Sequence, residues 1–189
     1  MKIGLYFGSF NPVHIGHLAI ANYFVEFSDM EQLWFVVSPQ NPFKEKKSLL
    51  AEHHRLALVK VAIEDDLRFR ASNVEFSMPQ PSYTIDTLTY LKEKYEEHEF
   101  VLIMGEDNLK GFHKWKNYQE ILDNHQIYVY PRDYKTIKKT LYDNITIVDA
   151  PLIEVSSSFI RNAIKEGKDV SFFTQYKVSE YLKEMHFYE

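Results

Sequence analysis

Short runs of apolar residues alternate along this chain with segments in which apolar residues recur every three or four positions. Unbroken apolar runs predict strands buried on both faces, and the wider spacing predicts helices with one buried face. The alternation of the two predicts an α/β fold, with a mostly parallel sheet and helices on both of its faces. The predicted strands cover residues 3–7, 33–37, 67–74, 100–104, 126–130 and 145–148. The predicted helices cover residues 18–24, 49–64, 106–122, 158–165 and 176–185, with another one up to residue 95 and a helical or irregular piece over 134–142.

Hydroxyl and glycine residues mark two of the helix ends. Ser82 or Thr84 is predicted to cap the helix that follows the proline-containing loop, because a hydroxyl oxygen there accepts a hydrogen bond from a helical amide. Ser156–Ser158 are predicted to cap a later helix, which Gly167 ends.

Length, charge and cysteine content narrow the class of protein. The 189 residues suit one domain, which we expect to span residues 1–189. Basic residues number 22 and acidic residues 27, so the chain lacks the broad basic surface of a nucleic-acid binder, and we expect no nucleic-acid partner. The absence of cysteine excludes disulfides, thiolate zinc sites and cysteine nucleophiles. No signal peptide or long apolar span is present, so we expect a cytoplasmic protein without a membrane partner.

The loop between the first predicted strand and its helix has the make-up of an anion site. Gly8 allows a tight turn, Ser9 offers a hydroxyl, and Gly16 allows close packing at the helix start. The first amides of a helix attract anions. His14 and His17 lie three residues apart and share one face if both are in the helical turn. Two imidazoles beside a helix N-terminus suit a phosphate better than a metal, and no histidine spacing supports a protein-bound metal.

The ten residues of this loop resemble the signature Gly-x-Phe-x-Pro-x-His-x-Gly-His of the nucleotidyltransferase superfamily, in its order from Gly8 through Phe10 to His17. The superfamily has a Rossmann-like fold and transfers a nucleoside monophosphate from a nucleoside triphosphate to an acceptor. The resemblance implies that the loop binds ATP and that both histidines meet the triphosphate. This chain has Asn11 where relatives often carry Asp, and Ser9 where many carry Thr.

The same histidine motif also spells the "HIGH" sequence of class I aminoacyl-tRNA synthetases. Those enzymes need a Lys-Met-Ser-Lys-Ser loop, which this chain lacks, and 189 residues leave no room for an anticodon-binding region. The synthetase interpretation is therefore rejected.

A second segment, residues 154–161, resembles the family signature Ile-Ser-Ser-Thr-x-Ile-Arg, with Val155 in place of Ile and Ser158 in place of Thr. Serine hydroxyls and helix amides bind phosphate oxygens, and an arginine clamps them in a fork. The resemblance implies ATP-phosphate contacts for Ser156, Ser157, Ser158 and Arg161.

Two further segments resemble the nicotinate-nucleotide adenylyltransferase branch. Ser82-Tyr83-Thr84 opens the first, and the second runs from Gly105 and Asp107 to Trp115. The resemblance implies that Tyr83 and Thr84 meet the nicotinate carboxylate, that Trp115 stacks on the pyridine ring, and that Asp107 binds a ribose hydroxyl. The same resemblance assigns Gly105 to the ATP side, and Ser38 and Arg132 to the acceptor nucleotide. It assigns Lys44, or else Lys46 or Lys47, to the phosphates. Lys44 follows Asn41-Pro42-Phe43, where the family has a Pro-Pro-His run.

The resemblance therefore implies transfer of AMP from ATP to nicotinate mononucleotide, forming deamido-NAD and pyrophosphate in NAD biosynthesis. His14, His17, Arg161 and Lys44 are the expected catalytic residues, and Mg²⁺ is expected to arrive with ATP. The alternatives are another adenylyl- or cytidylyltransferase, acting on nicotinamide mononucleotide or phosphopantetheine, and a non-catalytic nucleotide-binding regulator. The presence of His14, His17 and Arg161 together argues against the regulator, because a protein that only binds a nucleotide would not need all three. The preference for nicotinate over nicotinamide, and a homo-oligomeric state, stay open.

Overall fold

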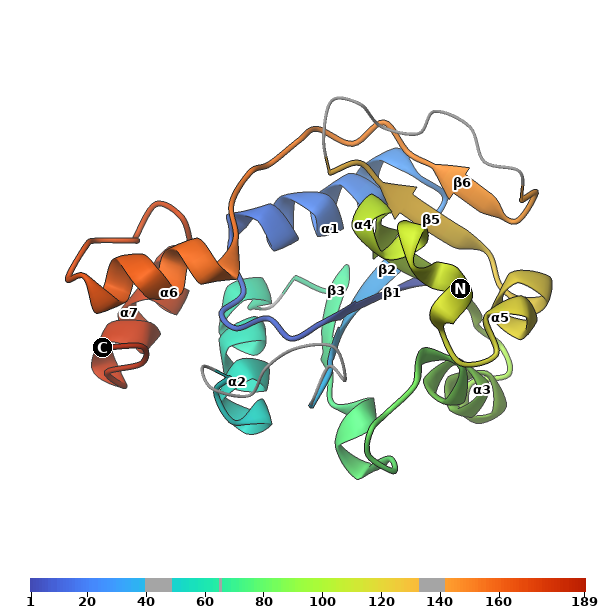
Figure 1. The fold of residues 1–189 in the computed structure, drawn as a ribbon, viewed down its shortest axis with the longest axis horizontal. Helices are drawn as coiled ribbons and strands as arrows, with labels where there is room; N and C mark the ends of the chain where they lie inside the picture. The colour runs from blue at the N-terminus through green and yellow to red at the C-terminus, as the bar shows by residue number, and fades with distance from the viewer. Residues whose placement is uncertain (40–48, 65, 133–141) are drawn as a thin grey trace.

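The computed structural model of the chain describes residues 1–39, 49–64, 66–132 and 142–189, and its centre is one parallel sheet (Figure 1). Its strand order is β3-β2-β1-β4-β5-β6, and every pair of neighbours is parallel. The mostly parallel sheet is thus confirmed. The strands are β1 (Lys2–Gly8), β2 (Gln32–Val37), β3 (Phe69–Ser72), β4 (Glu99–Gly105), β5 (Ile127–Tyr130) and β6 (Ile145–Ile147).

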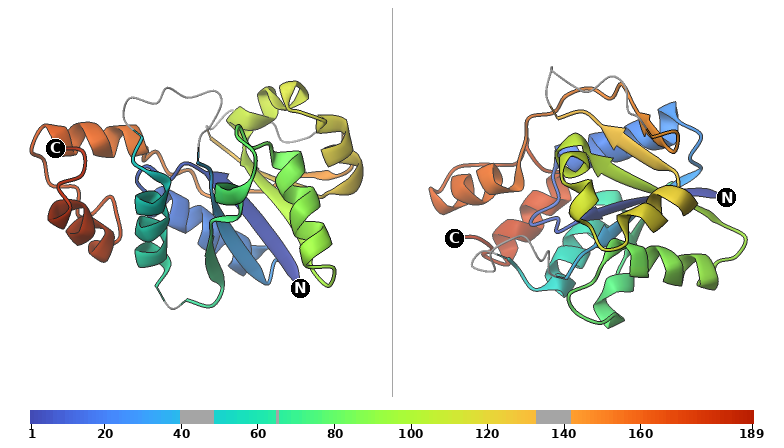
Figure 2. Two further views of the ribbon diagram at one scale, coloured as in Figure 1. Left: turned by 90° about the horizontal axis from the view of Figure 1, so that it is seen from below. Right: turned by 45° about the vertical axis from the view of Figure 1, so that its right-hand side comes forward.

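Helices cover both faces of the sheet, as the sequence predicts. They are α1 (Ile15–Phe27), α2 (Glu52–Ile63), α3 (Thr84–Lys94), α4 (Glu106–Lys110), α5 (Tyr118–Asn124), α6 (Ser157–Lys165) and α7 (Tyr176–Glu184), with 3-10 turns η2 (Val74–Ser77) and η3 (Phe112–Lys114). Alternate residues of β4 face opposite sides, so Ile103 packs in the core with α1, α2 and α7, while Leu102 packs with α3 and α5. Figure 2 shows α6 and α7 together at one side of the molecule, beyond α2.

The direction in which the chain winds reverses between β1 and β4. From β1 the chain moves outward through β2 to β3, then returns to pair β4 on the other side of β1. Ligands of such sheets bind at the carboxyl ends of the strands at this reversal. Gly8 and Gly105 end the two strands there.

Three predicted elements differ in detail. The third strand is shorter than residues 67–74, because β3 begins at Phe69 and gives way to η2 at Val74. The predicted helix over 106–122 is divided into α4, η3 and α5, and Asn117 at the second break has a left-handed φ of 50°. Of the piece predicted over 134–142, only Tyr142 lies within the described residues.

The predicted cap of α3 is wrong. Tyr83 occupies the N-cap position and makes no capping hydrogen bond with its side chain. The Ser82 hydroxyl donates instead to the carboxylate of Glu75, at 3.0 Å, and Thr84 is already helical. The predicted cap of α6 is confirmed, because Ser156 accepts from the amide of Phe159 at 3.2 Å. No helix in the described part of the chain is long and apolar enough to cross a membrane.

Candidate active site

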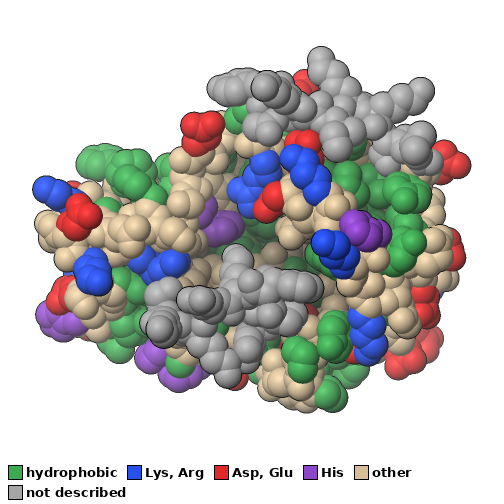
Figure 3. All heavy atoms as spheres, in the orientation of Figure 1, with side chains coloured by type: hydrophobic (Ala, Val, Ile, Leu, Met, Phe, Trp, Pro, Cys, Tyr) green, Lys and Arg blue, Asp and Glu red, His purple; other side chains and the backbone are tan. Residues whose placement is uncertain are grey.

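A cavity of about 380 Å³ opens at the carboxyl ends of β1, β4 and β5. Segments far apart in the sequence line it: the loop after β1, Leu49 before α2, the loop and turn after β4, the end of β5 with Arg132, and the start of α6. Figure 3 shows a hollow near the middle of this face, with histidine and Lys or Arg side chains at its edge. The lining includes Gly8, Ser9, Phe10, His14, His17, Gly105, Asp107, Trp115, Arg132, Ser156, Ser157, Ser158 and Arg161. Gly16 lines an adjoining cavity of about 270 Å³, which also contacts both histidines.

The two histidines form a cap at the start of α1. His14 is the N-cap residue, and its Nδ1 accepts from the amide of Gly16 at 3.1 Å. The Nδ1 of His17 accepts in turn from the amide of His14 at 3.2 Å, and the ring centroids lie 3.7 Å apart. Because both Nδ1 atoms accept, the proton of each neutral ring sits on Nε2. Each imidazole is therefore oriented as a donor through Nε2.

His14 is held in its neutral form. Only 5% of its surface is exposed, and burial together with the nearby charge of Arg132 lowers its pKa to about 4. Burial disfavours the imidazolium, and a neighbouring cation disfavours it further. At neutral pH His14 is thus a hydrogen-bond donor without a charge.

The two glycines of the loop serve packing inside the protein. A Cβ on Gly8 would come within 2.7 Å of the Phe10 ring, which folds back over it with a left-handed φ of 44°. The Phe10 ring is buried and meets the His17 ring edge-on, with centroids 5.1 Å apart. A Cβ on Gly16 would press on the His14 ring at 3.0 Å. The glycines therefore permit the placement of Phe10 and His14, which in turn fix His17.

Arg161 joins α6 to the loop after β1. Its Nη1 donates to the carbonyl of Asn11 at 2.8 Å, and its Nη2 donates to the Ser158 hydroxyl at 3.1 Å. The Ser157 hydroxyl donates to the carbonyl of Pro12 at 2.9 Å. These bonds hold the two segments that resemble the superfamily signatures against each other at one side of the cavity.

On the opposite side of the cavity, the residues after β4 meet those after β5. The Asp107 carboxylate accepts from Arg132 Nε at 3.3 Å. A Cβ on Gly105 would press on that carboxylate and lie 2.9 Å from Arg132 Nε, so any larger residue would require the pair to move. Trp115 lines the cavity with its ring packed against Phe112, at a centroid distance of 5.3 Å.

Other predicted site residues lie elsewhere. Tyr83 and Thr84 stand at the start of α3, outside the cavity lining, and the Lys116 ammonium lies 4.7 Å from the centre of the Tyr83 ring. Ser38 follows β2, and its amide donates to the carbonyl of Gly8 at 2.9 Å. Lys44 lies outside the described residues, as do Lys46 and Lys47.

Sequence reasoning missed Arg55 of α2, which is fully buried behind the loop. Its guanidinium donates to four backbone carbonyls at 2.7–2.8 Å, those of Ser9, Ser38, Pro39 and Leu50. One arginine therefore joins the ends of β1 and β2 to the entry of α2. The signal was present in the spacing, because Arg55 shares the helix face of Leu58, Val59 and Ala62.

Among the described residues, no group of three or more His, Asp or Glu side chains is placed to hold a metal ion. Among the described residues that line the cavity, Asp107 is the one with a carboxylate, and it forms an ion pair with Arg132. This donor set fits a cation that enters with a triphosphate and keeps most of its waters, as Mg²⁺ does.

Comparison with known proteins identifies the family of this chain. The family model for cytidylyltransferase-like proteins matches residues 5–163. A "Probable nicotinate-nucleotide adenylyltransferase" of Flavobacterium johnsoniae is 53% identical over 192 residues, covering 100% of both chains. One of Christiangramia forsetii is 52% identical over 196 residues, covering 100% of this chain and 98% of the relative.

The fold also matches solved structures. A nicotinic acid mononucleotide adenylyltransferase of Plasmodium falciparum complexed with NaAD superposes with a TM-score of 0.83, covering 99% of this chain and 97% of the other at 18% identity. The same Plasmodium enzyme complexed with APC gives a TM-score of 0.82, covering 99% and 96% at 18% identity. The chain therefore belongs to the cytidylyltransferase-like family, and within it to the nicotinate-nucleotide adenylyltransferases.

Proposed function

We propose that this protein transfers AMP from ATP to nicotinate mononucleotide, giving deamido-NAD and pyrophosphate. The observation that carries the proposal is one cavity lined by the histidine cap of α1, by Arg161 and by Trp115. The first two belong to the phosphate signatures and the third to the pyridine-nucleotide segment. The names of the full-length relatives support the same reaction.

In the proposed reaction an oxygen of the acceptor phosphate attacks the α-phosphorus of ATP in line. The bond from that phosphorus to the bridging oxygen breaks, and pyrophosphate leaves with the electron pair. No covalent enzyme intermediate forms, so the protein contributes positioning and stabilisation of charge. His14 and His17 donate from Nε2 to phosphate oxygens, and Arg161 supplies positive charge. A Mg²⁺ ion bound to the ATP phosphates would neutralise part of the charge of the leaving pyrophosphate.

On the acceptor side, the proposal gives Trp115 the stacking face for the pyridine ring and Asp107 a ribose hydroxyl. Tyr83 and Thr84 meet the carboxylate, with Ser38 and Arg132 nearby, and Lys44 approaches the phosphates from the segment outside the described residues. Because Tyr83 and Thr84 lie outside the cavity lining, the proposal places the acceptor between Trp115 and the start of α3.

Pyrophosphate release from ATP and Mg²⁺ tests the reaction, measured in parallel with nicotinate mononucleotide, nicotinamide mononucleotide and phosphopantetheine. We expect strong release with the nicotinate form. Comparable release with nicotinamide mononucleotide would remove the acid selectivity, and release with phosphopantetheine alone would overturn the acceptor.

Two variants test the assigned roles in the same assay. His17→Ala should lower kcat by at least 100-fold, since a lost donor to the reacting phosphate costs roughly 3 kcal/mol. Trp115→Ala should raise the KM for nicotinate mononucleotide far more than the KM for ATP. Normal turnover in the first variant, or equal effects on both substrates in the second, would contradict these roles.

A further inference from the structure

A buried carboxylate lies beside the proposed acceptor site and outside the cavity lining. Glu75, in the 3-10 turn η2, has 2% of its surface exposed. Burial raises the pKa of this carboxyl, and the hydrogen bonds that it accepts oppose the rise. No lysine, arginine or histidine in the described segments forms an ion pair with it. A carboxylate buried without a cation is costly unless hydrogen bonds compensate for the lost water.

Three hydroxyl groups surround the Glu75 carboxylate. Ser82 donates to Oε2 at 3.0 Å and Thr87 donates to Oε1 at 2.9 Å, and the Ser38 side chain lies close enough to help lower the pKa of the carboxyl. Hydrogen bonds to an ionised acceptor are stronger and more directional than those between neutral groups. The two bonds therefore hold Ser82 and Thr87 in fixed positions relative to each other, beside Ser38.

Two of these partners belong to, or adjoin, residues that the proposed function assigns to the acceptor nucleotide. Ser38 is itself one of those residues, and Ser82 directly precedes Tyr83 and Thr84. The backbone of Glu75 also takes part, since its carbonyl accepts from Gln80 Nε2 at 3.1 Å. The loop before α3 is thus folded onto Glu75 by its side chain and its main chain together.

The bond from Ser82 to Glu75 also affects the capping of α3. A serine before a helix ordinarily caps it, but here the hydroxyl is occupied by Glu75, and the N-cap residue Tyr83 makes no capping hydrogen bond with its side chain. The capping role at this helix start is therefore open to a group from outside the chain, such as the carboxylate of the acceptor.

We propose that Glu75 is a positioning residue that fixes the Ser82–Thr84 segment against Ser38 and thereby sets the affinity for the pyridine mononucleotide. This inference rests on the proposed function. It assigns Glu75 no contact with ATP or with the reacting phosphate, so its effect is confined to the acceptor.

Steady-state kinetics of Glu75→Gln test the proposal, with each substrate varied at saturating levels of the other. Glutamine keeps the size of the side chain but removes the charge and one acceptor oxygen. We expect the KM for nicotinate mononucleotide to rise about tenfold, while the KM for ATP and kcat stay within twofold of wild type. Ser82→Ala, in which the carboxylate stays intact, should raise the same KM in the same direction.

Two controls separate positioning from a general loss of structure. Leu88→Val shortens a fully buried side chain of α3 without touching the Glu75 carboxylate, so it should leave the acceptor KM unchanged. The double variant Glu75→Gln with Ser82→Ala should raise the acceptor KM no further than Glu75→Gln alone, because both changes remove one interaction.

The outcomes distinguish this inference from the function on which it rests. Wild-type protein that releases no pyrophosphate with nicotinate mononucleotide overturns both. If the wild type is active but the KM for nicotinate mononucleotide is unchanged in both Ser82→Ala and Glu75→Gln, only the role of Glu75 is overturned. The same holds if Leu88→Val raises this KM as much as Glu75→Gln does. If Glu75→Gln fails to fold, Ser82→Ala decides by itself.

Discussion

At the scale of single residues, the protonation state of His14 links the chemistry of the site to the stability of the fold. Its Nδ1 accepts from the amide of Gly16, and its pKa is about 4 because the ring is buried beside Arg132. In the unfolded chain the same side chain has an ordinary pKa of 6.5. Between these two values the unfolded state binds the extra proton, so the free energy of unfolding falls as pH falls.

We therefore predict that the protein loses about 2 kcal/mol of stability at this one residue between pH 7 and pH 5. The matched variant is His14→Asn, whose amide oxygen can still cap Gly16 but does not titrate. Urea unfolding of both proteins at the two pH values measures the difference. Equal losses in both would mean that His14 does not carry the linkage.

At the scale of secondary-structure elements, Arg55 attaches α2 to the carboxyl ends of β1 and β2, beside the site. Its guanidinium serves carbonyls after β1 and β2 and before α2, and burial lowers its pKa without removing its charge at neutral pH. Removing the side chain leaves several buried carbonyls without donors, each of which costs roughly 1–3 kcal/mol.

Arg55→Met should thus lower the free energy of unfolding by at least about 3 kcal/mol, even though methionine fills much of the same space. Arg55→Lys should recover only part of this loss, because one ammonium cannot reach four carbonyls in a fork. Urea unfolding at neutral pH ranks the three proteins. A lysine variant as stable as wild type would show that charge alone matters at this position.

The elements also show what sequence reasoning reaches and where it stops. The runs of β1, β2 and β4 are buried on both faces, so their apolar sequences alone predicted a parallel sheet. The pairing of His14 and His17 at the start of α1 was predicted because they lie three residues apart, but their capping of the helix was not. The partner of Ser82 was not, since Glu75 reaches it across a 3-10 turn that no periodicity reveals. Arg55 was missed for a different reason: its spacing placed it on the buried face of α2, but a charged residue in a helix is ordinarily expected in solvent.

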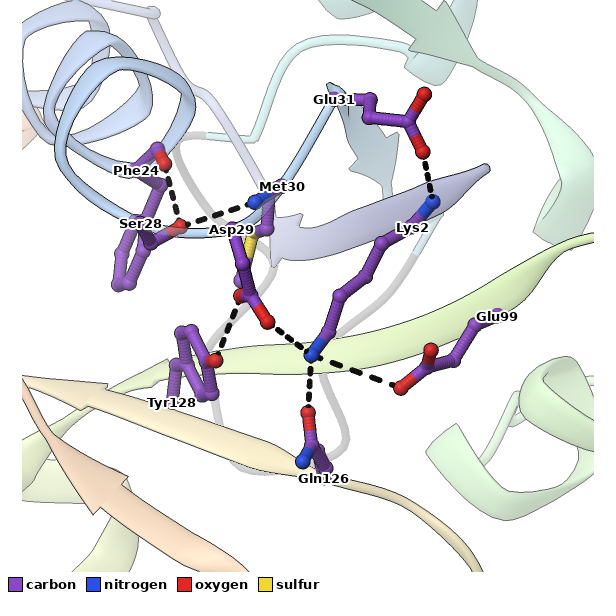
Figure 4. A network of polar contacts seen from close by, with 9 residues as sticks. All are labelled: Lys2, Phe24, Ser28, Asp29, Met30, Glu31, Glu99, Gln126 and Tyr128. Atoms are coloured by element: carbon purple, nitrogen blue, oxygen red, sulfur yellow. Dashed lines mark hydrogen bonds and ion pairs between the residues drawn. The ribbon is translucent and has the colours of Figure 1, made fainter.

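At the scale of the whole molecule, the carboxyl and amino ends of the strands differ in function. The cavity lies at the carboxyl ends of the strands, whereas the amino end of β1 is fastened by a polar cluster around Lys2 (Figure 4). The Lys2 ammonium binds the carboxylate of Asp29 at 2.6 Å, lies 3.6 Å from that of Glu99, and donates to Gln126. Tyr128 of β5 donates to Asp29 at 2.7 Å. The cluster thus joins β1 and β4 to β5 and to the turn before β2.

Both charges of the central pair are maintained at neutral pH. Burial alone would raise the pKa of Asp29, but hydrogen bonds from Lys2 and Tyr128 outweigh it and lower the pKa. Burial alone would lower the pKa of Lys2, but its bond to Asp29, together with the nearby Asp29, Glu99 and Tyr128 side chains, outweighs that effect and raises the pKa. The Asp29 contribution to stability is therefore lost only as the pH falls into the acid range, and the Lys2 contribution only as the pH rises into the alkaline range.

We predict that Lys2→Met separates stability from activity. The change removes three polar contacts of an ammonium whose side chain is 14% exposed, but Asp29 and Glu99 are both more than half exposed and regain water. The expected loss is therefore only about 1–2 kcal/mol in urea unfolding at pH 7. Because Lys2 begins the seven-residue strand β1, which spans roughly 20 Å before the loop at its other end, kcat and both KM values should stay within twofold of wild type. Glu31→Gln, which alters the exposed carboxylate that accepts from the Lys2 amide at 2.8 Å, serves as the control and should change stability by less than about 0.5 kcal/mol. A fall in kcat under conditions where Lys2→Met stays folded would show instead that the sheet transmits strain from its amino edge to the site.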